Sequence, residues 1–375
     1  MRRGLTSILC LLLCGVWLAL STSGAQACQP RVVVKAGDSL AKLARIHLGS
    51  VFRFAEIHDA NRALIGPDPN RLRVGQELKM PCVTLGSALD WSRMPDARST
   101  AALAQQTDLQ ILDIRSAKAV AKGVIPGAVS IPFKLWRGPK ENPGAIPADA
   151  DLSRLIGQYG LRLDVPTVVV GKDASPMSMG RAAFVYWILK SLGARRLAIL
   201  RGGHANWVFE KLRVASTPTR LAAYQANLRM SDEWYARLDE VTKIADGTVK
   251  GALLDARPER VYRRRTPQGQ SKPSTLPGAF NSSAPATTLA LTKAPSVEIG
   301  VLSVLERLKG VDVNWEAAPV VTFCETGELS ALNWFYASEL SGIRNVKLYP
   351  ESARGWRASG GKMVVPPPVK SRYDD

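Results

Sequence analysis

The chain has 375 residues, enough for two or three domains, and an ordinary apolar content of 46%. Its 50 Lys and Arg residues against 32 Asp and Glu residues give a formal net charge of +18. A basic protein suits acidic polymers or small anions as partners. No recognised nucleic-acid-binding motif is present, so we expect no nucleic-acid partner.

The N-terminus has the three-part pattern of a secretory signal peptide. Met1-Arg2-Arg3 is basic, residues 8–20 are apolar, and Ala25-Gln26-Ala27 suits a signal peptidase. The apolar run is too short to span a membrane comfortably. We therefore predict a signal peptide over residues 1–27 and a periplasmic or cell-wall-associated protein that does not span the membrane. An uncleaved anchor and lipidation of Cys28 are the alternatives.

Three cysteines remain after such a cleavage. Exported proteins meet an oxidising compartment, where cysteines pair if they can. Cys28 and Cys82 bracket one small segment, and we predict a disulfide between them, worth about 4 kcal/mol in the chain-entropy model. The alternative is that Cys28 is lipidated or free and Cys82 is simply buried. Cys324 is then the odd thiol, which makes it a candidate reactive group.

Residues 31–81 have the pattern strand, helix, helix, strand. Strands are expected at 31–34 and 76–80, and a second helix at 53–61. Asp38 or Ser39 can cap the first helix.

This segment resembles a LysM domain, which we place at residues 28–82. The matching pieces are residues 34–40, 57–61 and 74–81. The resemblance implies a small βααβ fold in which Cys28 and Cys82 approach each other. It also implies peptidoglycan binding around Gly37, Asp38, Ser39 and the turn that begins at Ile65. A LysM domain that serves only as a protein contact surface is the alternative.

From residue 107 the chain repeats itself at spacings of 142 to 152 positions. The matching pieces are the Asp-x-Arg triplets at 113–115 and 255–257, the Pro-Gly-Ala triplets at 126–128 and 277–279, the apolar strands at 168–170 and 320–323, and the tryptophans Trp207 and Trp356. Each copy alternates apolar strands with helical patterns, which is typical of a parallel sheet with helices on both faces.

The repeat defines the expected domain organisation. We predict a linker at 83–105, a first domain at 106–215, a connecting segment at 216–247, a second domain at 248–362 and a disordered tail at 363–375.

The most specific motif is Cys324–Leu329, a Cys-x-x-Gly-x-x loop that directly follows an apolar strand. Together with the repeated triplets and with Gly202-Gly203…Trp207, it resembles a tandem rhodanese over residues 107–360. The nearest likeness is to exported bacterial thiosulfate/3-mercaptopyruvate sulfurtransferases. The implied fold class is α/β: two rhodanese-like, doubly wound parallel-sheet domains preceded by the LysM domain.

Cys324 is the predicted nucleophile. Loop amides and the positive end of the following helix favour a thiolate at this position. A thiolate would attack the outer sulfur of thiosulfate or 3-mercaptopyruvate, form a persulfide and pass that sulfur to a thiol, cyanide or protein acceptor. Neither a cofactor nor a metal is expected. A buried structural cysteine is the alternative reading.

Several residues should support this loop, whose members are Glu325, Thr326, Gly327, Glu328 and Leu329. We expect Ser330 to cap the following helix, and Asp255 and Arg257 to brace the site from below. Two-domain rhodaneses often place an arginine at the position of Val261; here Arg260 and Arg263 are the candidate replacements.

The two glutamates in the loop argue against a dianionic donor, because nearby carboxylates repel it. This charge weakens the case for thiosulfate more than the case for sulfur transfer.

The first copy is predicted to be catalytically silent. Its loop, residues 171–178, has no cysteine, and the hydroxyls of Ser175 and Ser178 cannot carry a stable persulfide. Arg181 either faces the cleft between the domains or forms a structural salt bridge.

Other activities fit less well. Phosphatases of this fold need Cys-x5-Arg, and Ser330 stands at the arginine position. His47, His58 and His204 are not spaced as metal ligands. Two rivals remain: a non-catalytic envelope protein that uses degenerate rhodanese domains as interaction surfaces, and a sulfur-carrier partner.

Overall fold

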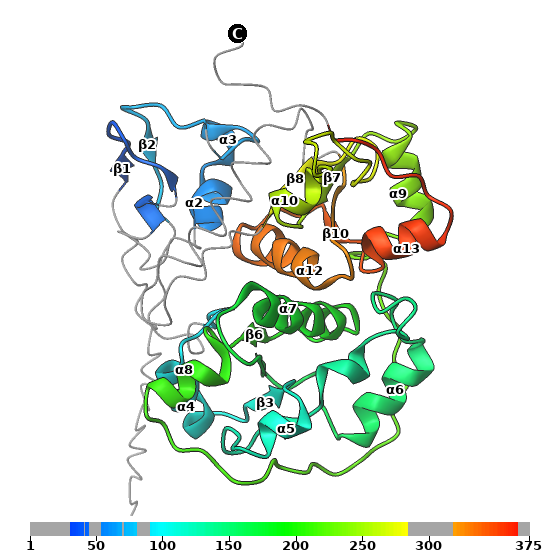
Figure 1. Ribbon diagram of the computed structural model, residues 1–375. Coiled ribbons are helices and arrows are strands. Elements are labelled where there is room, and N and C mark those ends of the chain that lie inside the picture. Colours follow the sequence, from blue (N-terminus) through cyan, green and yellow to red (C-terminus); the bar gives the residue numbers. More distant parts are fainter. Residues whose placement is uncertain are drawn as a thin grey trace, which may run out of the picture.

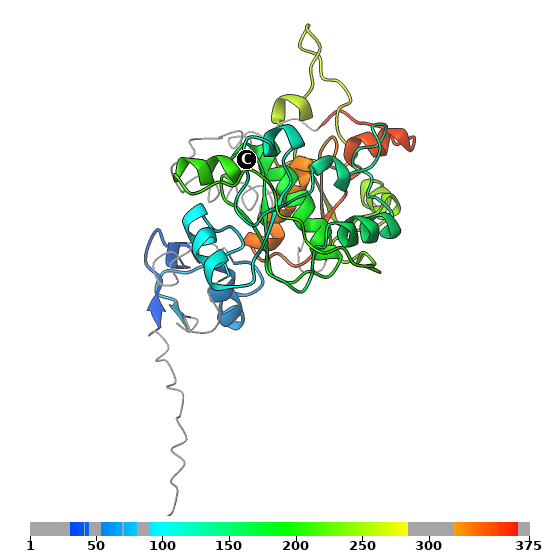
Figure 2. The same cartoon turned by 90° about the horizontal axis from the view of Figure 1, so that it is seen from below.

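The computed structural model describes residues 31–40, 42–44, 54–69, 71–80, 91–283 and 318–366. Two similar halves lie one above the other in Figure 1, and a small N-terminal unit lies at the edge of the molecule in both Figure 1 and Figure 2. The predicted signal peptide, the predicted disulfide between Cys28 and Cys82, and most of the predicted tail lie outside the described residues.

The N-terminal unit is held by a short sheet and a buried asparagine. Strand β1 (Val32–Val33) pairs antiparallel with β2 (Glu77–Leu78), and the helices α2 (Phe54–Ala60) and α3 (Arg62–Ile65) lie between them in the chain. The Asn61 amide donates to the carbonyls of Ile57 and Lys79 and accepts from the Lys79 amide. This residue therefore ties the helices to the last strand.

The first half is a four-stranded parallel sheet with helices around it. The strand order is β4-β3-β5-β6. Its elements are α4 (Ala97–Gln106), β3 (Gln110–Asp113), α5 (Ala117–Val120), β4 (Val129–Ser130), η2 (Phe133–Trp136), α6 (Asp149–Gln158), β5 (Thr167–Val170), α7 (Pro176–Ser191), β6 (Leu197–Ile199) and α8 (Gly203–Phe209). All but the last residue of helix α4 lies in the predicted linker, and this helix packs on α8 of the first half.

The second half repeats this topology. Its order, β8-β7-β9-β10, matches the first sheet strand for strand, and all its pairs are parallel. Its elements are α9 (Leu238–Ala245), β7 (Ala252–Asp255), α10 (Glu259–Tyr262), β8 (Phe280–Asn281), β9 (Val320–Phe323), α12 (Glu328–Trp334), the π-helix η3 (Phe335–Leu340), β10 (Val346–Leu348) and α13 (Ser352–Ala358). The predicted internal repeat is confirmed. Helix α9 lies in the segment that was expected to connect the domains, and it packs on β7 of the second half.

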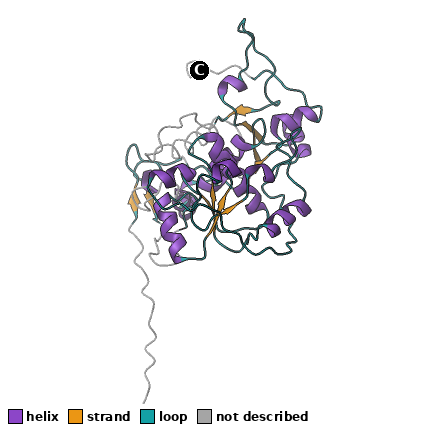
Figure 3. Cartoon of the chain, turned by 60° about the horizontal axis from the view of Figure 1, so that its bottom comes forward, coloured by secondary structure: helices purple, strands orange, loops and turns teal. Residues whose placement is uncertain are grey.

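The apolar strands are buried on both faces. In β5, Val168 and Val170 join one hydrophobic core and Val169 joins another. In β9, Val321 and Phe323 likewise lie in a different core from Val320. Strands with two buried faces need helices above and below them, which is the layering seen in Figure 3.

The halves meet through α7 and α12, which lie side by side at the centre of Figure 1 and share one core. Most of α7 is buried, because one side covers its own sheet and another contacts α12. Gly180 makes the close approach possible, since a Cβ there would lie 2.4 Å from the Glu328 carbonyl oxygen.

No described helix is both long and apolar enough to cross a membrane. Away from the contact between the halves, the loop of residues 263–272 projects outward (Figure 2).

Candidate active site

Cys324 lies at the carboxyl end of β9, where parallel sheets commonly place their ligands. Gly327 turns the chain from the strand into α12 with a φ of 99°, in the left-handed region that favours glycine. A Cβ at Gly327 would also lie 2.7 Å from the ring of Phe184 and 2.8 Å from the Pro350 carbonyl oxygen. Backbone conformation and space both require glycine here.

The sulfur of Cys324 sits among hydrogen-bond donors. The Gly327 amide donates to Sγ at 3.1 Å, and the hydroxyls of Ser330 and Ser352 lie 3.5 and 3.9 Å away. The thiol is free, and only 2% of the residue is exposed. The surroundings of the sulfur are thus polar although the residue is buried, and its donors can stabilise negative charge on Sγ.

The expected helix cap at Ser330 is wrong. Gly327 occupies the cap position and α12 begins at Glu328, so Ser330 lies inside the first turn. Its hydroxyl donates back to the Gly327 carbonyl at 3.0 Å and lies beside Sγ. The left-handed glycine lets the helix start earlier than the serine suggested.

Glu328 is buried and paired with an arginine from the other half. The Arg137 Nη1 donates to Glu328 Oε1 at 2.7 Å, and its Nη2 donates to the Thr326 carbonyl at 2.8 Å. The Thr326 hydroxyl donates to the second oxygen of Glu328 at 2.7 Å. The first half therefore holds the loop that carries Cys324.

Glu325 is neutralised from the second half. Its carboxylate pairs with Arg257 at 3.3 Å and with Arg357 of α13. Three arginines thus face the two loop carboxylates, so the loop does not present the uncompensated negative charge that its sequence suggested.

Asp255 and Arg257 form a buried pair below the loop. Arg257 donates through Nε to Oδ1 at 2.9 Å and through Nη2 to Oδ2 at 2.5 Å, and Nη2 also reaches the Ser274 carbonyl. Asp113 and Arg115 repeat this arrangement in the first half, where no cysteine needs bracing. The pair is therefore an element of each domain's structure, and only Arg257 extends it to the Cys324 loop through Glu325.

Burial and neighbouring charges shift the pKa values of two arginines near the loop. Burial acts against the charged form of Arg257, but Asp255 and Glu325 outweigh it and raise the pKa of Arg257. Burial lowers the pKa of Arg137, and the nearby positive charge of Arg181 lowers it further. Glu328 acts in the opposite direction but does not outweigh them. Arg137 and Arg181 are therefore close enough for their positive charges to repel each other.

Phe133 supports both first-half arginines. The guanidinium carbons of Arg137 and Arg181 lie 5.1 and 5.6 Å from its ring centroid. The ring meets Phe184 edge-on at 5.8 Å, and Phe184 packs beside Gly327. Arg181 is exposed and forms no ion pair among the described residues, so its predicted alternative role in a structural salt bridge is not seen.

The other predicted supporting residues lie on or beside α10. Arg260 is exposed, and Arg263 bonds Glu259 at 3.2 Å and lies over the ring of Tyr262. Leu329 is half-buried in α12. The arginines that contact the loop are instead Arg137, Arg257 and Arg357.

The loop of the first half is filled by its own serine. The Ser178 hydroxyl accepts from the amides of Lys172 and Asp173 at 2.8 and 3.0 Å. A Cβ at Gly171, the position equivalent to Cys324, would lie 2.9 Å from this hydroxyl. Ser175 caps α7. The loop amides are therefore occupied, and a side chain at position 171 has no room.

Sequence reasoning missed Arg137, Arg357 and Ser352. No local pattern connects the two arginines to the cysteine loop. Ser352 had a signal, because it stands 149 positions after Gly203, the same spacing as Trp207 and Trp356.

The predicted glycan-binding residues mostly build the start of the first helix. Gly37 has a left-handed φ of 79°, and Ser39 accepts from the Lys42 amide. Hydrogen bonds from Lys42 and from the Lys35 amide hold the pKa of Asp38 below its usual value. Ile65 is buried, so its side chain packs in the core.

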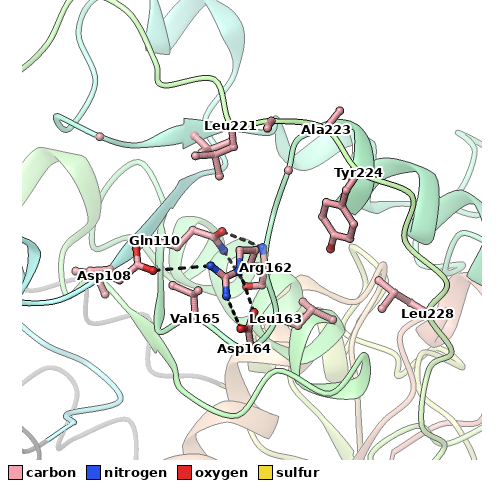
Figure 4. A pocket seen from close by; sticks show the side chains of 15 residues that line it. Asp108, Gln110, Arg162, Leu163, Asp164, Val165, Leu221, Ala223, Tyr224 and Leu228 are labelled. Atoms are coloured by element: carbon pink, nitrogen blue, oxygen red, sulfur yellow. Dashed lines mark hydrogen bonds and ion pairs between the residues drawn. The ribbon is translucent and has the colours of Figure 1, made fainter.

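A pocket of about 800 Å³ lies away from the cysteine, at the amino end of β3 in the first half (Figure 4). Its charged groups satisfy one another: Arg162 pairs with Asp164 at 2.5 Å and with Asp108 at 4.0 Å, and Gln110 bonds the Arg162 backbone. No cysteine, serine or histidine lines it, and we assign no chemistry to it. Within the described ranges, no cluster of His, Cys, Asp and Glu could hold a metal ion.

Glu351 lies next to the site, and its carboxyl has a raised pKa. It precedes Ser352, accepts a hydrogen bond from the Tyr235 hydroxyl through Oε1, and leaves its buried Oε2 without a partner. Burial raises the pKa of Glu351 by more than the Tyr235 hydrogen bond lowers it.

Comparisons of sequence and of structure with known proteins point to the same family. A model described as a rhodanese-like domain matches residues 96–210 and 237–359. Thiosulfate sulfurtransferases of Azotobacter vinelandii and Pseudomonas aeruginosa are each 29% identical over 250 residues, covering 66% of this chain and 88% of theirs. The 3-mercaptopyruvate sulfotransferase SseA of Escherichia coli has the same fold, with a TM-score of 0.57 at 19% identity, covering 70% of this chain and 98% of its own.

We predict that Glu351 makes stability depend on pH. A carboxyl whose pKa is raised by folding stabilises the protein while protonated and loses that contribution as pH rises through its folded pKa. The melting temperature of Glu351→Gln minus that of wild type should therefore be a few degrees higher at pH 7.5 than at pH 4.5. Glu233→Gln, at an exposed position, should follow wild type. The same pH dependence of the melting temperature in Glu351→Gln and in wild type would contradict the assignment.

Proposed function

This chain belongs to the rhodanese-like family and is a rhodanese-type sulfurtransferase, and we propose that it transfers sulfane sulfur through a persulfide on Cys324. One observation carries the proposal: an unpaired thiol at a strand end, with an amide donating directly to its sulfur, in a loop whose carboxylates are each paired with arginine.

The first step is attack of the Cys324 thiolate on the outer sulfur of the donor. With thiosulfate, the new bond joins Sγ to that sulfur, the donor's S–S bond breaks, and sulfite leaves with the electron pair. With 3-mercaptopyruvate, the C–S bond breaks and the departing carbon takes the electron pair and a proton. The Gly327 amide and the hydroxyls of Ser330 and Ser352 are placed to stabilise charge on the sulfur.

The second step returns the thiolate. A thiol, cyanide or protein nucleophile attacks the outer sulfur of the persulfide, and its S–S bond breaks toward Sγ. The cycle is a two-step covalent mechanism, and no group outside the chain and its two substrates is needed to balance it.

The first half, without a cysteine, contributes charge to the same site. Arg137 and Arg181 both lie against the ring of Phe133 and repel each other, yet only Arg137 has a carboxylate partner among the described residues. An anionic group of the donor placed beside Arg181 would relieve this repulsion. We assign the sulfonate or carboxylate of the donor to this position.

Replacement of the nucleophile tests the proposal directly. Wild type incubated with thiosulfate or 3-mercaptopyruvate should gain one sulfur atom by intact mass and release thiocyanate when cyanide is added. Cys324→Ser should gain none, and turnover should fall by about a thousandfold or more, because the covalent step is lost. A wild-type protein that forms no adduct with either donor, and no more thiocyanate than Cys324→Ser, would leave a non-catalytic role for the family fold.

Arg181→Ala tests the donor position. Loss of a charge-assisted contact at a partly exposed site should raise KM for thiosulfate about tenfold, with a smaller effect on kcat. Arg195→Ala is the matched control, because Arg195 is exposed just beyond the other end of α7. Equal KM values for Arg181→Ala and Arg195→Ala would place the anion elsewhere.

We further propose that the chain is exported and that its N-terminal unit binds peptidoglycan as a LysM domain. Support comes from the signal-like residues 1–27, the LysM-like segments, and the antiparallel pairing of β1 with β2 that brings the ends of the unit together. The site would lie at Gly37–Ser39 and at the turn after Ile65, with the Ile65 side chain itself in the core.

Sedimentation with purified peptidoglycan tests this second role. The chain from residue 28 should co-sediment, and a variant lacking residues 28–82 should remain in the supernatant while keeping its sulfur-transfer activity. Because the protein is basic, both should be compared at high salt, which screens non-specific attraction to an acidic polymer. Equal retention of the two proteins at high salt would assign any binding to the rhodanese-like halves.

A further inference from the structure

Ser352 has a backbone conformation that serines rarely adopt. Its φ is 56°, and Lys211 is the only other non-glycine residue with a positive φ in the part of the chain that the structure describes. A side chain in the left-handed region costs free energy, and such residues cluster at functional sites. Ser352 is also fully buried, so its hydroxyl makes no contact with solvent.

The first half shows that this position does not need a side chain. Gly203 has nearly the same φ, 59°, at the equivalent place. The next residue, His204, donates its amide to the Gly171 carbonyl at 2.9 Å, as Ala353 donates to the Cys324 carbonyl at 3.0 Å. The two backbones thus make the same turn and the same contact. Glycine stands in the half without the cysteine, and serine stands in the half with it.

The Ser352 hydroxyl connects the turn to the nucleophile. Its Oγ accepts from the Cys324 amide at 3.0 Å, just beyond the last residue of β9. The same hydroxyl has two acceptors for its single hydrogen: the Tyr349 carbonyl at 3.0 Å and the Cys324 sulfur at 3.9 Å. It is therefore bonded to the backbone of the cysteine and lies within reach of its sulfur.

We propose that Ser352 is a positioning residue for sulfur transfer, retained in a strained conformation because its hydroxyl fixes the Cys324 amide and directs Sγ toward the Gly327 amide. When the sulfur carries negative charge, the hydroxyl hydrogen turns from the Tyr349 carbonyl to Sγ. This inference rests on the proposed role of Cys324 and adds a residue from α13 to it.

Two substitutions separate strain from chemistry. Ser352→Gly removes both the hydroxyl and the strain, whereas Ser352→Ala removes the hydroxyl and keeps the strain. Both variants lose the hydrogen bond from the Cys324 amide, so the difference between them isolates the strain. We expect Ser352→Gly to melt above Ser352→Ala, because only Ser352→Gly relieves that strain. Both should form the persulfide about tenfold more slowly in a single turnover with thiosulfate, because both lose the same hydrogen bonds.

A readout that does not need sulfur transfer completes the test. The rate of Cys324 alkylation by iodoacetamide, followed by mass spectrometry across pH, should show its midpoint at higher pH in both variants than in wild type. Lys211→Gly is the matched control: it relieves the other positive φ at an exposed residue and should leave the alkylation profile unchanged.

The outcomes distinguish this inference from the proposed function. A shifted alkylation profile in both Ser352 variants supports the positioning role even if wild type transfers no sulfur. A Ser352→Gly protein with wild-type alkylation and wild-type persulfide formation overturns it, and would leave Ser352 as a packing residue. If Lys211→Gly shifts the profile as much as Ser352→Gly does, the effect is one of general stability and the inference fails.

Discussion

Glu328 joins the two halves of this protein at the loop that carries Cys324. Its carboxylate is buried against Arg137 of the first half, and its backbone carbonyl lies against Gly180 of α7. Removing one partner of a buried ion pair costs roughly 3–5 kcal/mol, because the other charge is left without compensation. The halves therefore cannot separate at α7 and α12 without disturbing the first residue of the helix that follows Cys324. The half without a cysteine therefore helps to hold the loop that carries Cys324.

The two halves also show how a loop with a cysteine differs from a loop without one on a similar backbone. Both loops follow the third strand of their half and turn their amides inward. In the first half the Ser178 hydroxyl accepts from the amides of Lys172 and Asp173, and Gly171 follows the strand. In the second half the Gly327 amide points at the Cys324 sulfur, and two hydroxyls stand nearby. The first loop lacks a cysteine, and it also lacks the space and the free donors that a cysteine would need.

The features that could be predicted from the sequence are those with a local or repeated pattern. The apolar runs at 168–170 and 320–323 became central strands, the triplets at 113–115 and 255–257 became matching buried pairs, and the two sheets share one order. Arg137 could not be predicted, because it reaches Glu328 across 191 positions from the other half. Ser330 was misplaced because the helix start depends on the φ of Gly327, which the sequence does not state. Ser352 was detectable only by setting the second repeat against the first.

The acidic loop is the clearest case in which composition and structure give opposite impressions. Glu325 and Glu328 argue against an anionic donor when the loop is considered alone. In the folded chain each carboxylate fixes arginines from elsewhere: Glu325 holds Arg257 and Arg357, and Glu328 holds Arg137. A guanidinium bonded to a carboxylate is held in a defined orientation. The glutamates therefore fix the positions of the arginines around the loop. The electrostatic character of the Cys324 site is therefore a property of three separate elements and of their packing, and a change in any one of them would alter which anions the thiolate can meet.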